Sequence, residues 1–113
     1  MGIYNSGREP TADFSAVTGF EWDSGNSMKN EKHGVSDAEA EQLFVNEPLV
    51  VLEDPAHGKG ERRWHALGRT NDGRLLHAMF TLRADGTRVR IISARPMHRN
   101  ERKAYEEAAQ ARP

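Results

Sequence analysis

Arginine and histidine side chains gather in the second half of the chain. The segment Arg88-Val-Arg-Ile-Ile-Ser-Ala-Arg95 alternates cationic and apolar residues, and the segment that follows adds Arg99, Arg102 and Lys103. Guanidinium groups pair with phosphate in a bidentate way, and imidazole exchanges protons near pH 7. These residue types in this pattern predict either the binding of a polyanion or chemistry on phosphate.

The charge of the chain divides into an acidic half and a basic half. Residues 1–60 carry four Lys/Arg against eleven Asp/Glu, whereas residues 61–113 carry twelve against six, although the net charge is only −1. Such asymmetry indicates a nucleic-acid or acidic-partner surface in the basic half. The alternative is that the two halves neutralise each other in the fold, and we expect both effects.

Composition excludes several classes of site. The chain has no cysteine, which excludes disulfides, thiolate zinc sites and a cysteine nucleophile and fits a cytoplasmic location. The five histidines show no close ligand spacing, so we expect neither a metal nor another cofactor. The sequence shows no bilayer-spanning apolar run and no signal peptide, so we expect no membrane partner.

The elements that must position these side chains indicate one α+β domain over residues 19–113, preceded by a flexible tail over residues 1–18. Phe20-Glu-Trp-Asp23 has the alternation of a short strand. Asp23 can cap a helix over roughly residues 24–33, which Gly34 would end. A capping box of Ser36 and Glu39 predicts a second helix to about residue 46.

Four strands and a last helix are expected next. The strands cover residues 49–52, 62–69, 74–82 and 88–94, and the turn signals Asn71-Asp-Gly73 and Asp85-Gly86 join neighbours as hairpins. The last helix runs from about residue 98 to the end. This order predicts helices packed on one face of a four-stranded antiparallel sheet.

Strand alternation sorts the side chains by sheet face. If the apolar face packs on the helices, a cationic set lies on the solvent-facing surface: Arg63, His65, Arg69, His77, Arg88 and Arg90. One interpretation is an RNA-contacting surface. The other is a solvated outer face without a function.

Three further residues have a structural and a functional interpretation. His33 either contributes to chemistry or favours the dipole at a helix C-terminus. Glu101 either acts as a base or completes a capping box with position 98. Tyr105 is expected to pack in the core, and its hydroxyl can reach toward the basic surface.

Six segments occur in an order that resembles the BrnT toxins, across about residues 19–107. They are Phe20-Glu-Trp-Asp23, Lys32-His-Gly-Val35, Gly68-Arg69, Phe80-Thr81, Arg88-Val-Arg-Ile-Ile-Ser-Ala-Arg95 and Glu101-Arg-Lys-Ala-Tyr105. The resemblance implies a RelE-like fold and a ribonuclease of a bacterial type II toxin–antitoxin pair, which cleaves RNA and so stops translation. It also implies a BrnA-type antitoxin with a ribbon-helix-helix domain, through which the complex binds operator DNA and represses its own operon.

The resemblance also implies roles for particular residues. Recurrent family positions are occupied by Arg69, Arg90, Arg95, Glu101, Tyr105 and His33, whereas position 98 departs from the family because His98 stands where a threonine usually opens the helix. Adding His65 gives the predicted catalytic set of Arg69, Arg90, Arg95, His65, Glu101 and Tyr105. The predicted RNA-contacting set is Arg63, His77, Arg88, Arg99 and Arg102.

The predicted reaction is metal-independent attack of the RNA 2′-hydroxyl on the adjacent phosphorus. The base remains open between His65, His77 and Glu101. Arginines would hold the phosphate, with Arg90 the first choice. The alternative is a non-catalytic protein on the same fold, which binds nucleic acid or a partner without cutting RNA.

Overall fold

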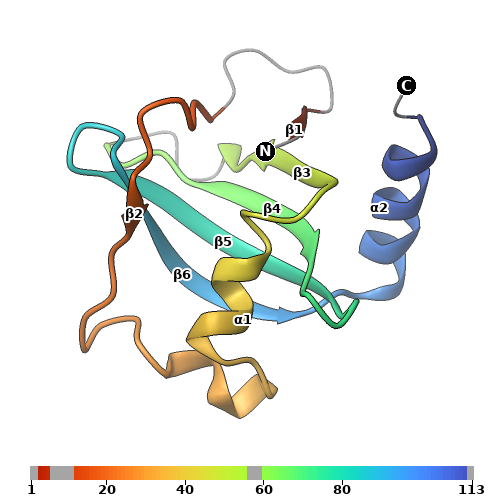
Figure 1. The fold of residues 1–113 in the computed structure, drawn as a ribbon, viewed down its shortest axis with the longest axis horizontal. Helices are drawn as coiled ribbons and strands as arrows, with labels where there is room; N and C mark the ends of the chain where they lie inside the picture. The colour runs from red at the N-terminus through yellow and green to blue at the C-terminus, as the bar shows by residue number, and fades with distance from the viewer. Residues whose placement is uncertain (1–2, 6–11, 56–59, 112–113) are drawn as a thin grey trace.

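The computed structural model describes residues 3–5, 12–55 and 60–111 and is built around a six-stranded mixed sheet (Figure 1). The strands are β1 (Ile3–Asn5), β2 (Gly19–Phe20), β3 (Leu49–Glu53), β4 (Trp64–Arg69), β5 (Leu75–Arg83) and β6 (Arg88–Pro96). The helices are a 3₁₀ helix, η1 (Lys29–His33), and two α-helices, α1 (Asp37–Gln42) and α2 (Arg99–Ala111). The strand order across the sheet is β1-β3-β4-β5-β6-β2.

The centre of the sheet matches the prediction and its edges do not. Strands β3 to β6 are antiparallel neighbours, as the hairpin signals predict. The sheet is nevertheless mixed, because β1 pairs in parallel with β3 and β2 pairs in parallel with β6. The prediction of a four-stranded antiparallel sheet was therefore incomplete at both edges. The short strand predicted at Phe20-Glu-Trp-Asp23 forms only as β2, Gly19–Phe20, and it joins the sheet beside β6, whereas β1 was not predicted.

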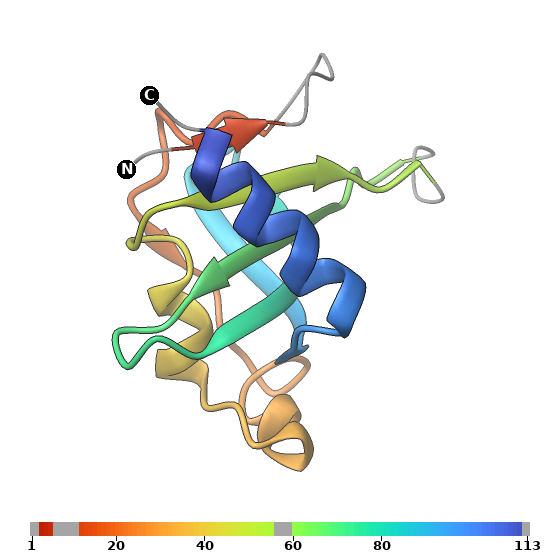
Figure 2. The ribbon, with the colours of Figure 1, turned by 90° about the vertical axis from the view of Figure 1, so that its right-hand side faces the viewer.

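The helices lie on opposite faces of the sheet, not on one face as predicted. Ala40, Leu43 and Phe44 from the α1 region belong to one buried cluster, whereas Tyr105 and Ala108 of α2 belong to another. Figure 2 shows α2 lying across the strands, with α1 beyond the far side of the sheet. The sheet face that the sequence left to solvent is thus partly covered by α2.

Phe80 is the centre of the larger core, on the α1 face. Its ring stacks on Trp64 and Phe14, with centroids 5.6 and 5.7 Å away, and meets the edge of Phe44 at 5.0 Å. Aromatic pairs in such geometries stabilise a core beyond the area that they bury. The smaller core, under α2, is formed by Val50, Leu67, Met97, Tyr105 and Ala108.

The two predicted N-terminal helices differ in outcome. Ser36 accepts the Glu39 amide and Glu39 accepts the Ser36 amide, so the capping box that starts α1 is confirmed. The helix predicted over residues 24–33 was wrong, because turns occupy its first half and only the 3₁₀ helix η1 forms. Met28 adopts a left-handed conformation with φ 60° before η1, which prevents a continuous helix.

Two buried asparagines cover the open edge of β6 beyond its short pairing with β2. The Asn26 amide donates to the Ile91 carbonyl at 2.9 Å, and the Asn30 side-chain oxygen accepts the Ala94 amide at 2.9 Å. Asn26 also donates to the Glu21 carbonyl. Side chains thus satisfy backbone groups that a neighbouring strand would otherwise pair.

The division into a tail over residues 1–18 and a domain over residues 19–113 stays a prediction. Residues 1–2 and 6–11 of that tail lie outside the described residues. Of the rest, β1 pairs with the sheet, and Phe14 and Val17 pack against the larger core. None of the helices in the described part of the chain has the length and apolar character needed to cross a membrane.

Candidate functional site

A pocket of about 250 Å³ lies between the sheet and the start of α2. Its lining residues come from four strands and one helix: Leu52, His65, Leu67, His77, Arg95 and Glu101. Two leucines form apolar walls, and the other four side chains carry ionisable groups. The sequence predicted all four of these ionisable residues as parts of a site.

Sheet register explains why these side chains converge. His77 on β5 lies opposite Leu67 of β4 and opposite Arg95 of β6. His65 lies two residues before Leu67 on the same face of β4, because strand side chains alternate. The chain then leaves β6 at Pro96 and enters α2, whose first turn brings Glu101 to the same pocket.

The two imidazoles are directly hydrogen-bonded. Nδ1 of His65 lies 2.8 Å from Nε2 of His77, so one ring donates and the other accepts. His77 is only 6% exposed, whereas the side chain of His65 is 32% exposed. Burial, followed by the nearby charge of Arg95, lowers the pKa of His77 to about 4. His77 is therefore neutral at pH 7.

His77 also has a buried polar atom without a hydrogen-bond partner among the described residues. This atom is Nδ1 of its ring. Buried polar atoms without a partner are uncommon in folded proteins.

Sequence analysis missed Asp54, which extends the imidazole pair. Oδ2 of Asp54 lies 3.7 Å from Nε2 of His65, the ring nitrogen that does not contact His77. The carboxylate can stabilise a positive charge on His65. The signal available in the sequence was its position: Asp54 directly follows β3, in which Leu52 lies opposite His65.

Arg95 and Glu101 form a bidentate ion pair. The two terminal nitrogens of Arg95 donate to the two oxygens of Glu101 at 2.8 and 2.9 Å. Oε1 of Glu101 also accepts the His98 amide at 2.8 Å, which confirms half of the expected capping box. The bond from Arg95 is the main cause that lowers the pKa of Glu101 to about 2. Glu101 is therefore ionised at pH 7 and is a weak base.

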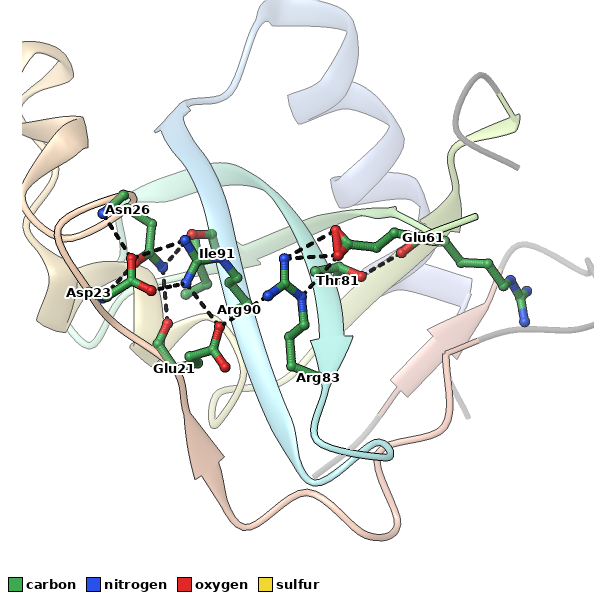
Figure 3. Close-up of polar contacts among 10 residues, drawn as sticks. Glu21, Asp23, Asn26, Glu61, Thr81, Arg83, Arg90 and Ile91 are labelled. Carbon is green, nitrogen blue, oxygen red and sulfur yellow. Dashed lines mark hydrogen bonds and ion pairs between the residues drawn. The ribbon is translucent and has the colours of Figure 1, made fainter. Parts of the chain in front are cut away.

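Arg90, the first choice from the sequence, lies in a different environment (Figure 3). One terminal nitrogen donates to Glu21 and to Asp23 at 2.9 Å, and the other donates to Asp23 at 3.1 Å. Its side chain is 14% exposed, and hydrogen bonds to Asp23 raise its pKa. The expectation of a solvent-facing Arg90 was wrong, because the acidic N-terminal half neutralises it.

Two more predicted catalytic residues lie outside the pocket lining. Arg69, at the end of β4, is exposed and donates through Nε to the Glu47 carbonyl at 2.8 Å. Tyr105 is buried in the smaller core, as expected for its ring, and its hydroxyl donates to the Pro48 carbonyl at 2.8 Å. The hydroxyl therefore bonds the backbone of the segment that leads into β3.

The remaining candidates are distributed over the surface. Arg63 is half-buried, whereas Arg88, Arg99, Arg102 and His33 are exposed. Arg99 and Arg102 lie on the first turns of α2, next to the pocket residue Glu101. His33 lies at the end of η1 beside Gly34, whose φ of 71° ends that helix as predicted.

The pocket holds the groups that phosphate chemistry requires. An imidazole pair can exchange a proton, and a guanidinium fixed by a carboxylate can hold an anion. In the described residues, no group of three or more His, Asp and Glu side chains is arranged to hold a metal ion.

The chain matches a known protein family over most of its length. Residues 22–101 match the family described as "Ribonuclease toxin, BrnT, of type II toxin-antitoxin system". That range includes every residue that lines the pocket. No curated protein matches the chain.

Proposed function

The chain belongs to the BrnT family of ribonuclease toxins from type II toxin–antitoxin systems, and from this membership we propose that it is a metal-independent endoribonuclease whose active site is the pocket at His65. The observation that carries the proposal is the convergence of the imidazole pair with Arg95 in one pocket. The proposed enzyme acts in the cytoplasm, where cleavage of RNA stops translation.

His65 is the proposed base. Glu101 is too weak a base with a pKa of about 2, and His77 is buried. His65 is the exposed member of the pair and can take the proton of an RNA 2′-hydroxyl at Nε2. The charge that forms on its ring is stabilised by Asp54, while His77 fixes the ring through Nδ1.

The reaction then follows from proton loss. The 2′ oxygen forms a bond to the adjacent phosphorus, and the bond from phosphorus to the 5′ oxygen breaks. The 5′ oxygen takes a proton from water, so the products are a 2′,3′-cyclic phosphate and a 5′-hydroxyl. Arg95 binds the phosphate oxygens as their charge increases, and Glu101 positions Arg95.

A BrnA-type antitoxin with a ribbon-helix-helix domain is the proposed partner. Toxin–antitoxin partners commonly cover the working face of the toxin, so the antitoxin would close the pocket. Operator DNA would be bound through the antitoxin, and the complex would repress its own operon. A RelE-like fold for the toxin is part of the same proposal.

Cleavage of end-labelled RNA by the purified chain tests the proposal. We expect His65→Gln and Arg95→Met each to reduce the rate about 100-fold or more, the usual range for loss of a proton-transferring or charge-stabilising group. His33→Gln is the matched control, because it changes an exposed histidine on η1 and should leave the rate unchanged.

The products and the variants can contradict the proposal. A 3′-phosphate that never passes through a cyclic phosphate, or full activity in His65→Gln, would show that this pocket does not work by the proposed reaction. RNA binding without any cleavage would favour the non-catalytic alternative.

A further inference from the structure

We propose that the exposed side of the first turns of α2 is the surface that guides single-stranded RNA into the pocket, through Arg99, Arg102 and Lys103. This inference rests on the proposed function, because it names the path of the substrate to the same site. It adds a binding surface outside the pocket.

The first argument is the pairing of cationic side chains. Five arginines on or next to the sheet form ion pairs with carboxylates: Arg62 with Glu53, Arg74 with Glu39, Arg83 with Glu61, Arg90 with Asp23 and Arg95 with Glu101. In contrast, no ion pair with another described residue holds Arg99, Arg102 or Lys103. All three side chains are exposed. Their charges are therefore available to a polyanion.

The second argument is that these charges oppose helix stability. The N-terminal end of a helix carries partial positive charge and favours anions, whereas the C-terminal end favours cations. Helix α2 has three cations in its first five residues, no basic residue in its last turn, and Glu106 and Glu107 in its second half. Arg99 and Lys103 are also four residues apart, where like charges repel. The helix dipole alone therefore does not account for Arg99, Arg102 and Lys103 at this end of α2.

The third argument is position. The same helical turn carries Glu101 into the pocket and Arg102 and Lys103 on its exposed side. The pocket next to them is lined by Arg95 and His77. An RNA strand that lies along these cations can place a phosphate on Arg95, because Arg95 is paired with Glu101 on the same turn of α2.

The test measures RNA affinity without cleavage. The probe is a labelled single-stranded RNA with 2′-O-methyl groups, which cannot be cut by 2′-hydroxyl attack, and the protein is the full chain. The variant Arg99→Gln/Arg102→Gln should bind at least about tenfold more weakly at low salt. The slope of log affinity against log salt should fall by about 1.4, since each neutralised single-strand phosphate contributes roughly 0.7. The control Lys29→Gln/Lys32→Gln removes two exposed cations at η1 and should change neither quantity.

A second measurement separates binding from a structural role. The melting temperature of Arg99→Gln/Arg102→Gln should be equal to or higher than that of the unmodified chain, because the removed charges oppose the helix dipole. A lower melting temperature would overturn the argument.

The remaining outcomes are also decisive. If Arg99→Gln/Arg102→Gln leaves RNA affinity and the salt slope unchanged, the inference is overturned. This holds also if the variant binds the antitoxin more weakly. If the unmodified chain binds the probe at α2 but never cleaves ordinary RNA, the proposed nuclease function fails while this surface stands.

Discussion

At the scale of single residues, two neighbours in the pocket have low pKa values for different reasons. Burial holds His77 in its neutral form, whereas the Arg95 guanidinium holds Glu101 in its charged form. The pocket therefore contains one imidazole that cannot easily gain a proton and one carboxylate that cannot easily accept one. His65, the more exposed imidazole of the pocket, is the proposed base for this reason.

The pKa of His77 predicts how stability depends on pH. Its usual value of 6.5 applies in the unfolded chain and about 4 in the fold, so the unfolded chain binds more protons between these values. The free energy of unfolding should therefore fall as pH drops from 6.5 to about 4. Urea unfolding across this range checks the prediction, and in His77→Gln the loss should be smaller. An equally steep loss in the variant would assign it to other groups.

At the scale of elements, Gly68 of β4 lies very close to Leu43, the residue that follows α1. A Cβ atom built on Gly68 would lie 3.1 Å from Cγ of Leu43 and 3.3 Å from its carbonyl oxygen. Leu43 is fully buried, so it has little room to move. The Gly68-Arg69 pair of the family resemblance thus has a packing explanation at its first residue.

This contact predicts a cost for a larger residue at position 68. Gly68→Val should lower the free energy of unfolding by about 1–3 kcal/mol, the usual range for overpacking a core. The cost should be smaller in a Leu43→Ala background, because the shortened side chain leaves room. Denaturant unfolding of the two single variants and the double variant measures this coupling, and additive effects would contradict the explanation.

Local sequence patterns predicted the helices and strands better than they predicted which elements pack against one another. The capping box of Ser36 and the hairpin signals act between residues that are close in sequence, so α1 and the four central strands could be predicted. The side chosen by α2 depends on Tyr105 and Ala108 meeting Val50 and Leu67, which no local pattern encodes. For this reason the prediction of an exposed cationic sheet face was only partly right.

The candidate site, too, could be predicted only in part from the sequence. Strand alternation placed His65 and His77 on one face, and the structure brings them together with Arg95 and Glu101. Residue types alone did not show which arginines would be held by carboxylates from distant segments. Arg90 is the clearest case, because its partner Asp23 lies 67 residues earlier in the chain.

At the scale of the whole molecule, the acidic and basic halves of the sequence meet in the fold. Glu21 and Asp23 bind Arg90, Glu21 also contacts Arg83, and Glu39 binds Arg74. Mutual neutralisation, the alternative to a functional surface, therefore accounts for much of the charge asymmetry. It leaves the start of α2 as a place where cations remain without carboxylates.

The Arg90 contacts predict a stability effect rather than a catalytic one. Arg90→Met should lower the free energy of unfolding by about 1–3 kcal/mol, as expected when hydrogen bonds to charged groups are lost. The rate of RNA cleavage by the folded protein should stay within about threefold of the unmodified chain, because a catalytic contribution is typically 100-fold or more. Calorimetry and cleavage assays measure the two effects. Loss of cleavage in a variant of normal stability would restore Arg90 as a catalytic residue.

Asn26 and Asn30, which hydrogen-bond to the edge of β6, restrict how a second protein can join the sheet. A peptide that extends a sheet needs exposed amides and carbonyls along an outer strand. At Ile91 and Ala94 those groups are already bound by Asn26 and Asn30, which are buried beside them. A partner strand cannot add there without first displacing both side chains, so we do not expect an antitoxin segment to extend the sheet at this part of β6.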